Sequence, residues 1–253
     1  MNQVKIRKLV FGEGRPKICV PITGRTREEI ALRTAELKAA KPDLAEWRAD
    51  WYEEVFDGEK LEATLAWLRE ELGELPLLVT FRTREEGGEQ NVSPEDYAAF
   101  LRTVLMSGQA DLIDVELFRG EELLRDICRE AKAQGVKVIA SSHDFEKTPA
   151  KEEILARLIR MQDCGADLLK LAVMPQDAAD VLTLLSATLE MSEKYAKQPV
   201  VTMSMGAKGA VSRLAGEVFG SAMTFGSAGV ASAPGQVSVP ELKMALEVLR
   251  QGK

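Results

Sequence analysis

The sequence is poor in the residue types that hold metals and disulfides. It has one histidine and three cysteines, Cys19, Cys128 and Cys164, among 253 residues. An odd number of widely spaced cysteines supports neither a disulfide framework nor a CxxC metal site, so we expect the three to be reduced and structural. The sequence also lacks an apolar stretch of about 18 residues, and its first residues lack the apolar core of a signal peptide. These absences predict a soluble, cytoplasmic protein that spans no membrane.

Positive charge is also scarce. Lys and Arg number 33 against 40 Asp and Glu, which gives a formal net charge of −7 at pH 7, and no Lys/Arg cluster stands out. This composition argues against nucleic acid or an anionic membrane as a partner. An anionic ligand would therefore be held by a few well-placed arginines. The chain is 45% hydrophobic and no linker or low-complexity tract divides it, so residues 1–253 should form a single domain.

Short apolar runs alternate with longer amphipathic segments, with a repeat of roughly thirty residues. Eight such units in one domain indicate an α/β fold, a (β/α)8 TIM barrel. A doubly wound open sheet is the alternative, but no GxGxxG fingerprint follows the first strand. The predicted strands are 17–23, 43–50, 76–83, 110–117, 136–143, 166–173, 199–205 and 221–227, and the predicted helices lie near 26–41, 59–72, 93–107, 120–134, 149–164, 176–196, 208–218 and 239–250.

The segment before the first unit and two helix starts add local detail. Residues 1–16 alternate between apolar and polar side chains, which predicts a short N-terminal β-hairpin that closes the barrel floor. Ser93-Pro94 and Thr148-Pro149 are capping signals, because proline is favoured in the first helical turn and a hydroxyl ahead of it can accept a backbone hydrogen bond. Both helices should therefore begin at these pairs.

Several predicted strands carry charged side chains on one face, although a buried parallel strand is normally apolar on both faces. In the strand 43–50, Trp47 lies on one face while Glu46 and Arg48 lie on the other. Because active sites of such barrels lie at the carboxyl ends of the strands, we interpret these side chains as an active-site mouth. The alternative is an ion-pair network that neutralises itself. The pattern recurs at Arg82, Asp114, Glu116, Ser141 and His143.

The single histidine and one lysine stand out within this pattern. His143 ends an apolar run, and Lys170 lies in the middle of another, ADLLKLAVMP. Histidine titrates near neutrality and serves as acid or base, while burial of a lysine favours its neutral, nucleophilic amine. The pair therefore suggests Schiff-base chemistry with a proton shuttle. A purely structural histidine and a lysine that extends to solvent from an edge strand are the alternatives.

Blocks along the whole chain resemble type I 3-dehydroquinate dehydratase, the Schiff-base-forming dehydroquinase family. That family is a (β/α)8 barrel, is usually a homodimer, and uses neither a metal nor an organic cofactor. The resemblance implies dehydration of 3-dehydroquinate to 3-dehydroshikimate, a reaction of the shikimate pathway and of quinate degradation. The blocks occur in the family's order and read LAEWRAD, TFRTREEGGEQ, DLIDVELF, SSHDFEKTP, GADLLKLAVMP, MSMG, SRLAGEVFGSAMTFG and ASAPGQ.

The resemblance implies three catalytic residues. Lys170 would be the nucleophile that condenses with the substrate ketone to form an imine. His143 would remove the proton alpha to the imine and later donate a proton to the departing hydroxyl group. Glu86, in the REEGGEQ block, would orient His143 and tune its basicity.

The resemblance also implies a set of substrate-binding residues. Arg213 would bind the substrate carboxylate, a role that suits the paired donors of a guanidinium. Ser232 and Gln236 lie in a glycine-containing segment, 228–238, which we interpret as a lid that closes over substrate. Met203 and Met205, on the seventh strand, should pack against the ligand or Lys170; plain core packing is the alternative, and we do not assign them to the site. Asp114 and Glu116 receive no role. The expected hydroxyl-binding residues are Glu46, Arg48 and Arg82.

Two other kinds of function remain open from the residues alone. An aldolase acting on sugar phosphates would share the lysine, and Gly226 to Gly229 could act as a phosphate loop after the eighth strand. A barrel that only binds a small molecule is the other alternative, although it has no need of a buried lysine. Reduction by borohydride in the presence of dehydroquinate separates these cases, because only an imine leaves a stable adduct on Lys170.

Overall fold

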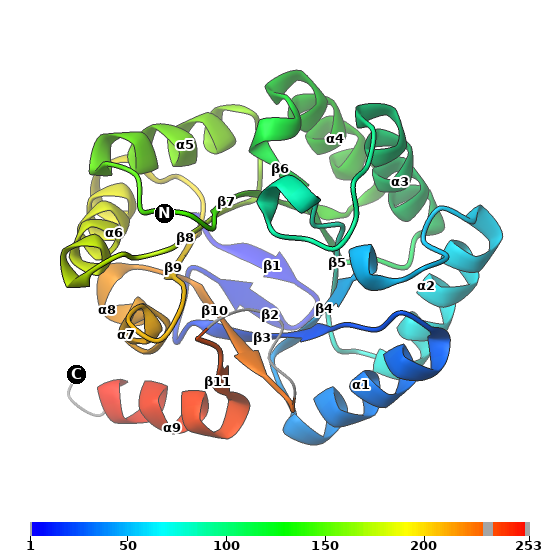
Figure 1. Cartoon of the computed structure of the whole chain (residues 1–253), viewed down its shortest axis with the longest axis horizontal. Helices are drawn as coiled ribbons and strands as arrows, with labels where there is room; N and C mark the ends of the chain where they lie inside the picture. Colours follow the sequence, from blue (N-terminus) through cyan, green and yellow to red (C-terminus); the bar gives the residue numbers. More distant parts are fainter. Residues whose placement is uncertain (1, 230–234, 251–253) are drawn as a thin grey trace.

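A computed structural model describes residues 2–229 and 235–250. Within these ranges eight parallel strands form the barrel predicted from the sequence, and the helices surround it as an outer ring (Figure 1). The first and last of these strands, β3 and β10, pair with each other. The backbone N–H of Ala222 donates to the carbonyl of Val200 at 2.7 Å and completes the ring. The strands are β3 (Lys17–Ile22), β4 (Leu44–Arg48), β5 (Leu77–Thr80), β6 (Leu112–Glu116), β7 (Lys137–Asp144), β8 (Leu168–Val173), β9 (Val200–Ser204) and β10 (Met223–Ser227).

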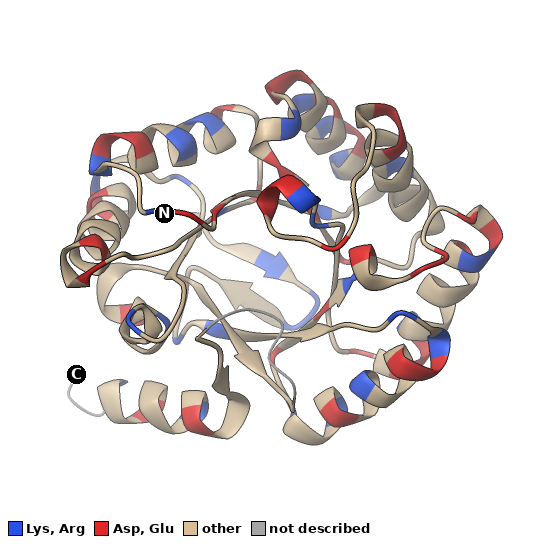
Figure 2. Ribbon diagram, in the orientation of Figure 1, with Lys and Arg blue, Asp and Glu red and all other residues tan. Residues whose placement is uncertain are grey.

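The helices follow the predicted order. In the view of Figure 2 charges of both signs are spread around the ring of helices, and ion pairs such as Lys38–Glu71 join neighbouring helices. The short strand β11 (Val237–Ser238) lies parallel to the end of β10. The helices are α1 (Arg27–Ala40), α2 (Gly58–Leu72), α3 (Pro94–Ser107), α4 (Glu121–Gln134), α5 (Lys151–Asp163), α6 (Ala178–Glu190), α7 (Ala210–Leu214), α8 (Gly216–Phe219) and α9 (Val239–Arg250).

The capping prediction is confirmed at one helix and wrong at the other. The Ser93 hydroxyl accepts a hydrogen bond from the N–H of Asp96, and Pro94 occupies the first turn of α3. Helix α5 instead begins at Lys151, and the preceding Ala150 offers no side-chain cap. The Thr148 hydroxyl donates to the carbonyl of Met174 and so ties two loops together instead of capping the helix.

Two predicted helices have different ends from those expected. Helix α6 ends at Glu190 and continues as a π-helical turn, Met191–Tyr195. The predicted helix 208–218 is divided at Ala215 into α7 and α8. The break occurs beside Gly216, a residue with weak helix propensity.

The N-terminal hairpin closes the barrel floor, as predicted. Strands β1 (Val4–Ile6) and β2 (Leu9–Phe11) pair antiparallel. Phe11 is fully buried, and burial of a side chain of this kind stabilises a fold by about 1.5–3 kcal/mol. The hairpin side chains belong to an apolar cluster with residues from the amino-terminal halves of the barrel strands, among them Leu44, Leu78, Leu112, Ile139, Leu168 and Val201.

A second apolar layer fills the space between strands and helices. Trp47 packs in this layer and is fully buried from solvent, in agreement with the alternation read from the sequence. Glu46, on the opposite face of β4, is buried in the barrel interior. The alternation therefore sends charged side chains inward above the apolar floor, at the carboxyl ends of the strands.

Candidate active site

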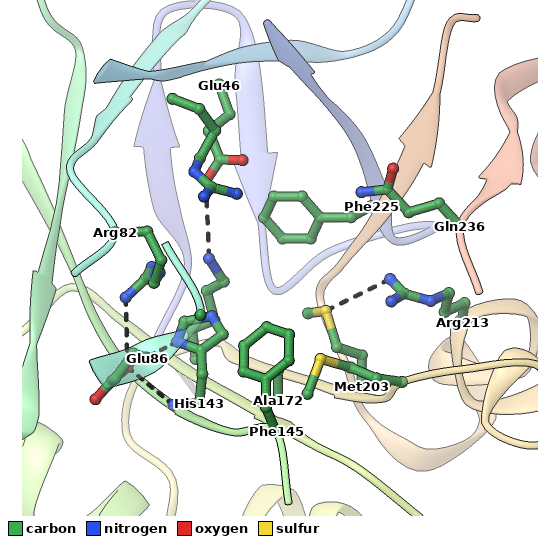
Figure 3. Close-up of a pocket in the computed structure, with 14 residues that line it drawn as sticks. Glu46, Arg82, Glu86, His143, Phe145, Ala172, Met203, Arg213, Phe225 and Gln236 are labelled. Atoms are coloured by element: carbon green, nitrogen blue, oxygen red, sulfur yellow. Dashed lines mark hydrogen bonds and ion pairs between the residues drawn. The ribbon is translucent and has the colours of Figure 1, made fainter. Parts of the chain in front are cut away.

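A cavity of about 210 Å³ opens at this charged end of the barrel. Figure 3 shows its side chains converging from the strand ends. Residues that the sequence singled out come together here, while Ser232 lies outside the described residues. The lining consists of Glu46, Arg48, Arg82, Glu86, Gly87, His143, Phe145, Lys170, Ala172, Met203, Met205, Arg213, Phe225 and Gln236.

Lys170 is buried on β8, and its amine lies among two carboxylates and an aromatic ring. Its Nζ lies 3.2 Å from Oδ2 of Asp114 and 3.8 Å from Oε1 of Glu46. The ring of Phe225 lies under the amine, with 4.6 Å from Nζ to the ring centroid. The leucines that flank Lys170 in the sequence point mostly to the helix layer, because side chains alternate along a strand. The apolar run thus places Lys170 within β8, and the carboxylates that contact its amine come from β4 and β6.

His143 and Glu86 form a closely packed pair beside the lysine. The imidazole Nδ1 lies 2.8 Å from Oε2 of Glu86, and the backbone N–H of His143 donates to the same oxygen at 2.9 Å. Because Oε2 of Glu86 accepts the hydrogen bond from the backbone N–H of His143, it is also placed to accept one from an Nδ1–H group. The tautomer that fits carries its proton on Nδ1 and leaves the lone pair of Nε2 available as a base.

The titration of this pair is shifted by its surroundings. Burial, together with the cations Arg82, Lys170 and Arg48, holds the pKa of His143 well below its ordinary value. Burial and the neighbouring Glu116 raise the pKa of Glu86 to about 8. Both shifts disfavour charge on the pair in the unliganded site, so the imidazole is the neutral base at neutral pH.

The single histidine makes this shift directly measurable. In tag-free protein labelled with ¹⁵N in the imidazole, we expect one ring titration with a midpoint well below 6.5 and a proton on Nδ1 at pH 7, because desolvation disfavours the imidazolium. Ring ¹⁵N shifts recorded from pH 4 to pH 9 test both points. A midpoint at or above 6.5, or a proton on Nε2 at pH 7, would contradict the assignment.

The loop that carries Glu86 depends on Gly87. Glu86 ends a 3₁₀ turn, Arg84–Glu86, and Gly87 follows in the left-handed region with φ of +83°. A Cβ atom at this position would lie 2.3 Å from the ring of Phe145. Glycine therefore allows the turn and lets Phe145 pack over it at the edge of the cavity.

Arg82 links the two reactive groups to a buried ion-pair network. Its Nη1 donates to Glu116 at 2.8 Å and lies 3.4 Å from Glu86, and its Nη2 donates to Asp114 at 2.8 Å. Although burial lowers the pKa of Arg82, these carboxylates raise it well above its ordinary value. Ser141 Oγ accepts from Arg82 and donates to Asp114. The sequence left an active-site mouth and an ion-pair network as alternatives, and Arg82 belongs to both.

Two further arginines lie at the cavity. Arg48 makes a bidentate ion pair with Asp50, with both N···O distances at 2.8 Å. Arg213, on α7, is almost completely buried, and its Nη1 lies 3.6 Å from the sulfur of Met203. Burial lowers the pKa of Arg213 to about 10, so it remains a cation at neutral pH. A buried cation that lines a cavity is suited to a carboxylate ligand.

Several lining residues had no place in the sequence-based site. Met203 and Met205 were expected to pack against the ligand or Lys170 but were not assigned to the site, and Phe145 and Phe225 were not singled out. Their alternation with polar residues near the ends of β7, β9 and β10 was the available signal. They add apolar surface to a cavity whose other side chains are mostly charged (Figure 3).

The structure gives little support to a phosphate loop at 226–229. Gly226 is paired with Val237 in the sheet, so its backbone is already engaged. A Cβ atom at Gly229 would lie 3.0 Å from a carboxylate oxygen of Glu36, and this negative charge disfavours an anion. Among the described residues no group of three or more histidine, cysteine or acidic side chains could hold a metal ion, and no helix is long and apolar enough to cross a bilayer.

The fold and the site together define a class: (β/α)8 barrels that hold a lysine and a histidine–carboxylate pair at the carboxyl ends of neighbouring strands. Sequence comparison gives the family. The model of type I 3-dehydroquinase matches residues 18–253, and the chain belongs to this family. It is 53% identical over 249 residues to the 3-dehydroquinate dehydratase of Syntrophotalea carbinolica, with 98% of each chain covered. It is 52% identical over 248 residues to that of Bacillus licheniformis, also with 98% of each chain covered.

Solved structures agree with this assignment. The type I 3-dehydroquinate dehydratase of Clostridium difficile, solved with covalently modified comenic acid, has a TM-score of 0.96 at 48% identity and covers 100% of this chain and 99% of its own. The 3-dehydroquinate dehydratase of Geobacillus kaustophilus has a TM-score of 0.96 at 37% identity, with 99% and 97% covered. A 3-hexulose-6-phosphate synthase, at 15% identity and a TM-score of 0.59, shares only the fold.

Proposed function

We propose that this chain dehydrates 3-dehydroquinate to 3-dehydroshikimate, the shikimate-pathway reaction of its family, through a Schiff base on Lys170. One observation carries the proposal: on adjacent strands, Lys170 and His143 line the same buried cavity. The covalent ligand in the Clostridium difficile relative supports it by showing that a family member can be modified covalently. No metal or organic cofactor is part of the proposed reaction.

The proposed chemistry begins at the lysine. The Nζ lone pair attacks the substrate ketone, and the ketone oxygen leaves as water, so that an iminium forms. The positive nitrogen draws electrons from the adjacent carbon and acidifies its proton. His143 removes that proton through Nε2, an enamine forms, and the same imidazolium then donates a proton to the hydroxyl group that departs. Hydrolysis of the product imine restores the lysine.

The other proposed roles follow from the sides of the cavity. Arg213 binds the substrate carboxylate, and Glu86 keeps His143 in its Nδ1–H tautomer. Glu46, Arg48 and Arg82 bind hydroxyl groups, with Arg82 also engaged by the protein's own carboxylates. Ser232 and Gln236 complete the set of substrate-binding residues.

Borohydride trapping tests the function itself. Purified enzyme reduced by borohydride in the presence of 3-dehydroquinate should gain a stable adduct, and peptide mapping should place it on Lys170. Enzyme treated with borohydride alone is the control. Absence of an adduct in the wild-type protein, or its location on another lysine, would overturn the proposal.

Replacement of Arg213 tests the carboxylate site. We expect Arg213→Ala to raise KM by roughly 30- to 1000-fold, because a desolvated, charge-assisted pair contributes about 2–4 kcal/mol. The variant should also discriminate less between dehydroquinate and an analogue without the carboxylate. Arg102→Ala, which removes an exposed ion pair with Glu130 on the outer helices, is the matched control. An unchanged preference for the carboxylate would assign its recognition to another residue.

We further propose that the protein is a single-domain, cytoplasmic homodimer that binds neither nucleic acid nor membranes. The net charge of −7 and the mixed charges of the helices support the last part of this proposal. Analytical ultracentrifugation at micromolar concentration tests the dimer, and a monomeric mass would contradict it.

A further inference from the structure

Asp114 is a buried carboxylate behind the amine of Lys170 and does not line the cavity. Its Oδ2 lies 3.2 Å from Nζ. Its Oδ1 accepts hydrogen bonds from Arg82 at 2.8 Å and from Ser141 at 2.6 Å. One oxygen is thus fixed by two donors while the other faces the reacting nitrogen. A substrate in the cavity would meet Lys170 but not Asp114.

This carboxylate remains charged although it is buried. Burial raises the pKa of an isolated carboxyl, but Arg82, Lys170 and Ser141 together hold the pKa of Asp114 below its ordinary value. Glu46, the second carboxylate near Nζ, lies farther away at 3.8 Å and lines the cavity, where it can turn to substrate. Asp114 is therefore the anion that stays beside the nitrogen throughout a reaction.

We infer that Asp114 is a positioning residue: it holds Nζ of Lys170 and keeps the imine nitrogen protonated, so that His143 acts on an iminium and not on a neutral imine. The inference rests on the proposed function. It matters because a neutral imine withdraws electrons weakly, whereas an iminium stabilises the developing enamine. A fixed negative charge in a low-dielectric site favours the protonated nitrogen.

The atoms and charges of the step balance without a proton on Asp114. One ammonium and one ketone give one iminium and one water. Transfer of one ammonium proton to the ketone oxygen frees the nitrogen lone pair that forms the new bond to carbon, and a second proton leaves the nitrogen when the oxygen departs as water. The iminium retains one N–H group, and Oδ2 of Asp114 is the acceptor already in place. The carboxylate can therefore remain ionised from ammonium to iminium.

Glu116 provides a matched control on the same strand. It is buried like Asp114 and binds the same guanidinium of Arg82 at 2.8 Å. Its other partners are the backbone N–H and the hydroxyl of Thr83, at 2.9 Å and 2.7 Å. Loss of either carboxylate disturbs Arg82, but of these two carboxylates Asp114 is the one that makes an ion pair with Lys170.

The experiment compares Asp114→Asn with Glu116→Gln by two reductants. Borohydride reduces imines in both protonation states, whereas cyanoborohydride at neutral pH reduces mainly the iminium. For Asp114→Asn with 3-dehydroquinate we expect a borohydride adduct within threefold of wild type, cyanoborohydride trapping at least tenfold slower, kcat at least tenfold lower, and KM within threefold. For Glu116→Gln we expect cyanoborohydride trapping within threefold of wild type, whatever its kcat.

The outcomes separate this inference from the proposed function. If wild-type enzyme gives no adduct on Lys170, the function fails. If wild type is trapped but the two variants lose cyanoborohydride trapping equally, or neither loses it, only the role of Asp114 is overturned. If Asp114→Asn does not fold, the inference is tested instead by a crystal structure of the borohydride-reduced wild-type adduct. Its amine nitrogen should lie within hydrogen-bond distance of Asp114 Oδ2, and loss of that contact would overturn the inference.

Discussion

Lys170→Ala should lower kcat for dehydroquinate dehydration by at least about 10³-fold, which corresponds to about 4 kcal/mol in the barrier. The substitution removes the atom that forms the imine, and no other lysine lines the cavity as described. Substrate affinity should change less, because in the proposed function the carboxylate and hydroxyl groups are bound by arginines and Glu46. Initial rates of product formation measure the first effect, and calorimetric titration with substrate measures the second.

Lys137→Ala is the matched control for this experiment. Lys137 lies at the amino end of β7 and pairs with Asp167, on the side of the barrel away from the cavity. Its loss should leave kcat within about twofold, since exposed ion pairs contribute little. If Lys170→Ala kept its activity within tenfold of wild type, a change of about 1.4 kcal/mol, covalent catalysis through this lysine would be untenable.

His143→Ala should separate formation of the imine from the proton transfers that follow it. The lysine is intact, so the ketone can still condense with it, but both the removal of the proton and the departure of the hydroxyl lose their shuttle. We expect kcat to fall by about 10²- to 10⁴-fold and a covalent adduct to accumulate on Lys170. Mass spectrometry of the intact protein during turnover would show the adduct.

A second variant distinguishes the imidazole from its support. Glu86→Gln keeps the imidazole and removes the carboxylate that lies 2.8 Å from Nδ1, so its activity should fall between wild type and His143→Ala. If His143→Ala turned over at wild-type rates and formed no adduct, the proton-transfer role of His143 would be wrong. Its role would then be structural, which its position at a strand end also permits.

The fold was predictable because the strands keep their two-residue alternation of apolar and polar side chains and the helices keep their repeat of about 3.6 residues. Alternation along β4 placed Trp47 with the helices and Glu46 inside, and the structure confirms both. Helix ends were less predictable, because local signals compete with tertiary contacts. Thr148 has the residue type of a cap, but the nearby carbonyl of Met174 takes its hydrogen bond. The division at Ala215 lies beside Gly216, whose weak helix propensity the apolar periodicity does not record.

The sequence marked most of the charged residues that line the cavity but not how they pair. The alternation marked Arg82, Asp114 and Glu116 as inward-facing, but their contacts join residues more than thirty positions apart in the chain. Such contacts depend on strand register and rotamer, which a single sequence leaves open. The apolar run around Lys170 predicted its burial correctly, but the carboxylates that contact its amine lie on other strands and could not be predicted from the run. Glu86 came only from the family resemblance, since a glutamate in a loop is ordinarily a solvated charge.

The hairpin beneath the barrel has an effect on the charges above it. Phe11 and its neighbours fill the amino-terminal end of the barrel, so water and dissolved ions meet an apolar plug on that side. Counter-ions therefore cannot screen Arg82 and its carboxylates from below, whereas exposed pairs are screened over about 8 Å at physiological ionic strength. The hairpin therefore helps to keep the site at a low dielectric, and we expect the attraction among the buried charges to depend little on the salt concentration.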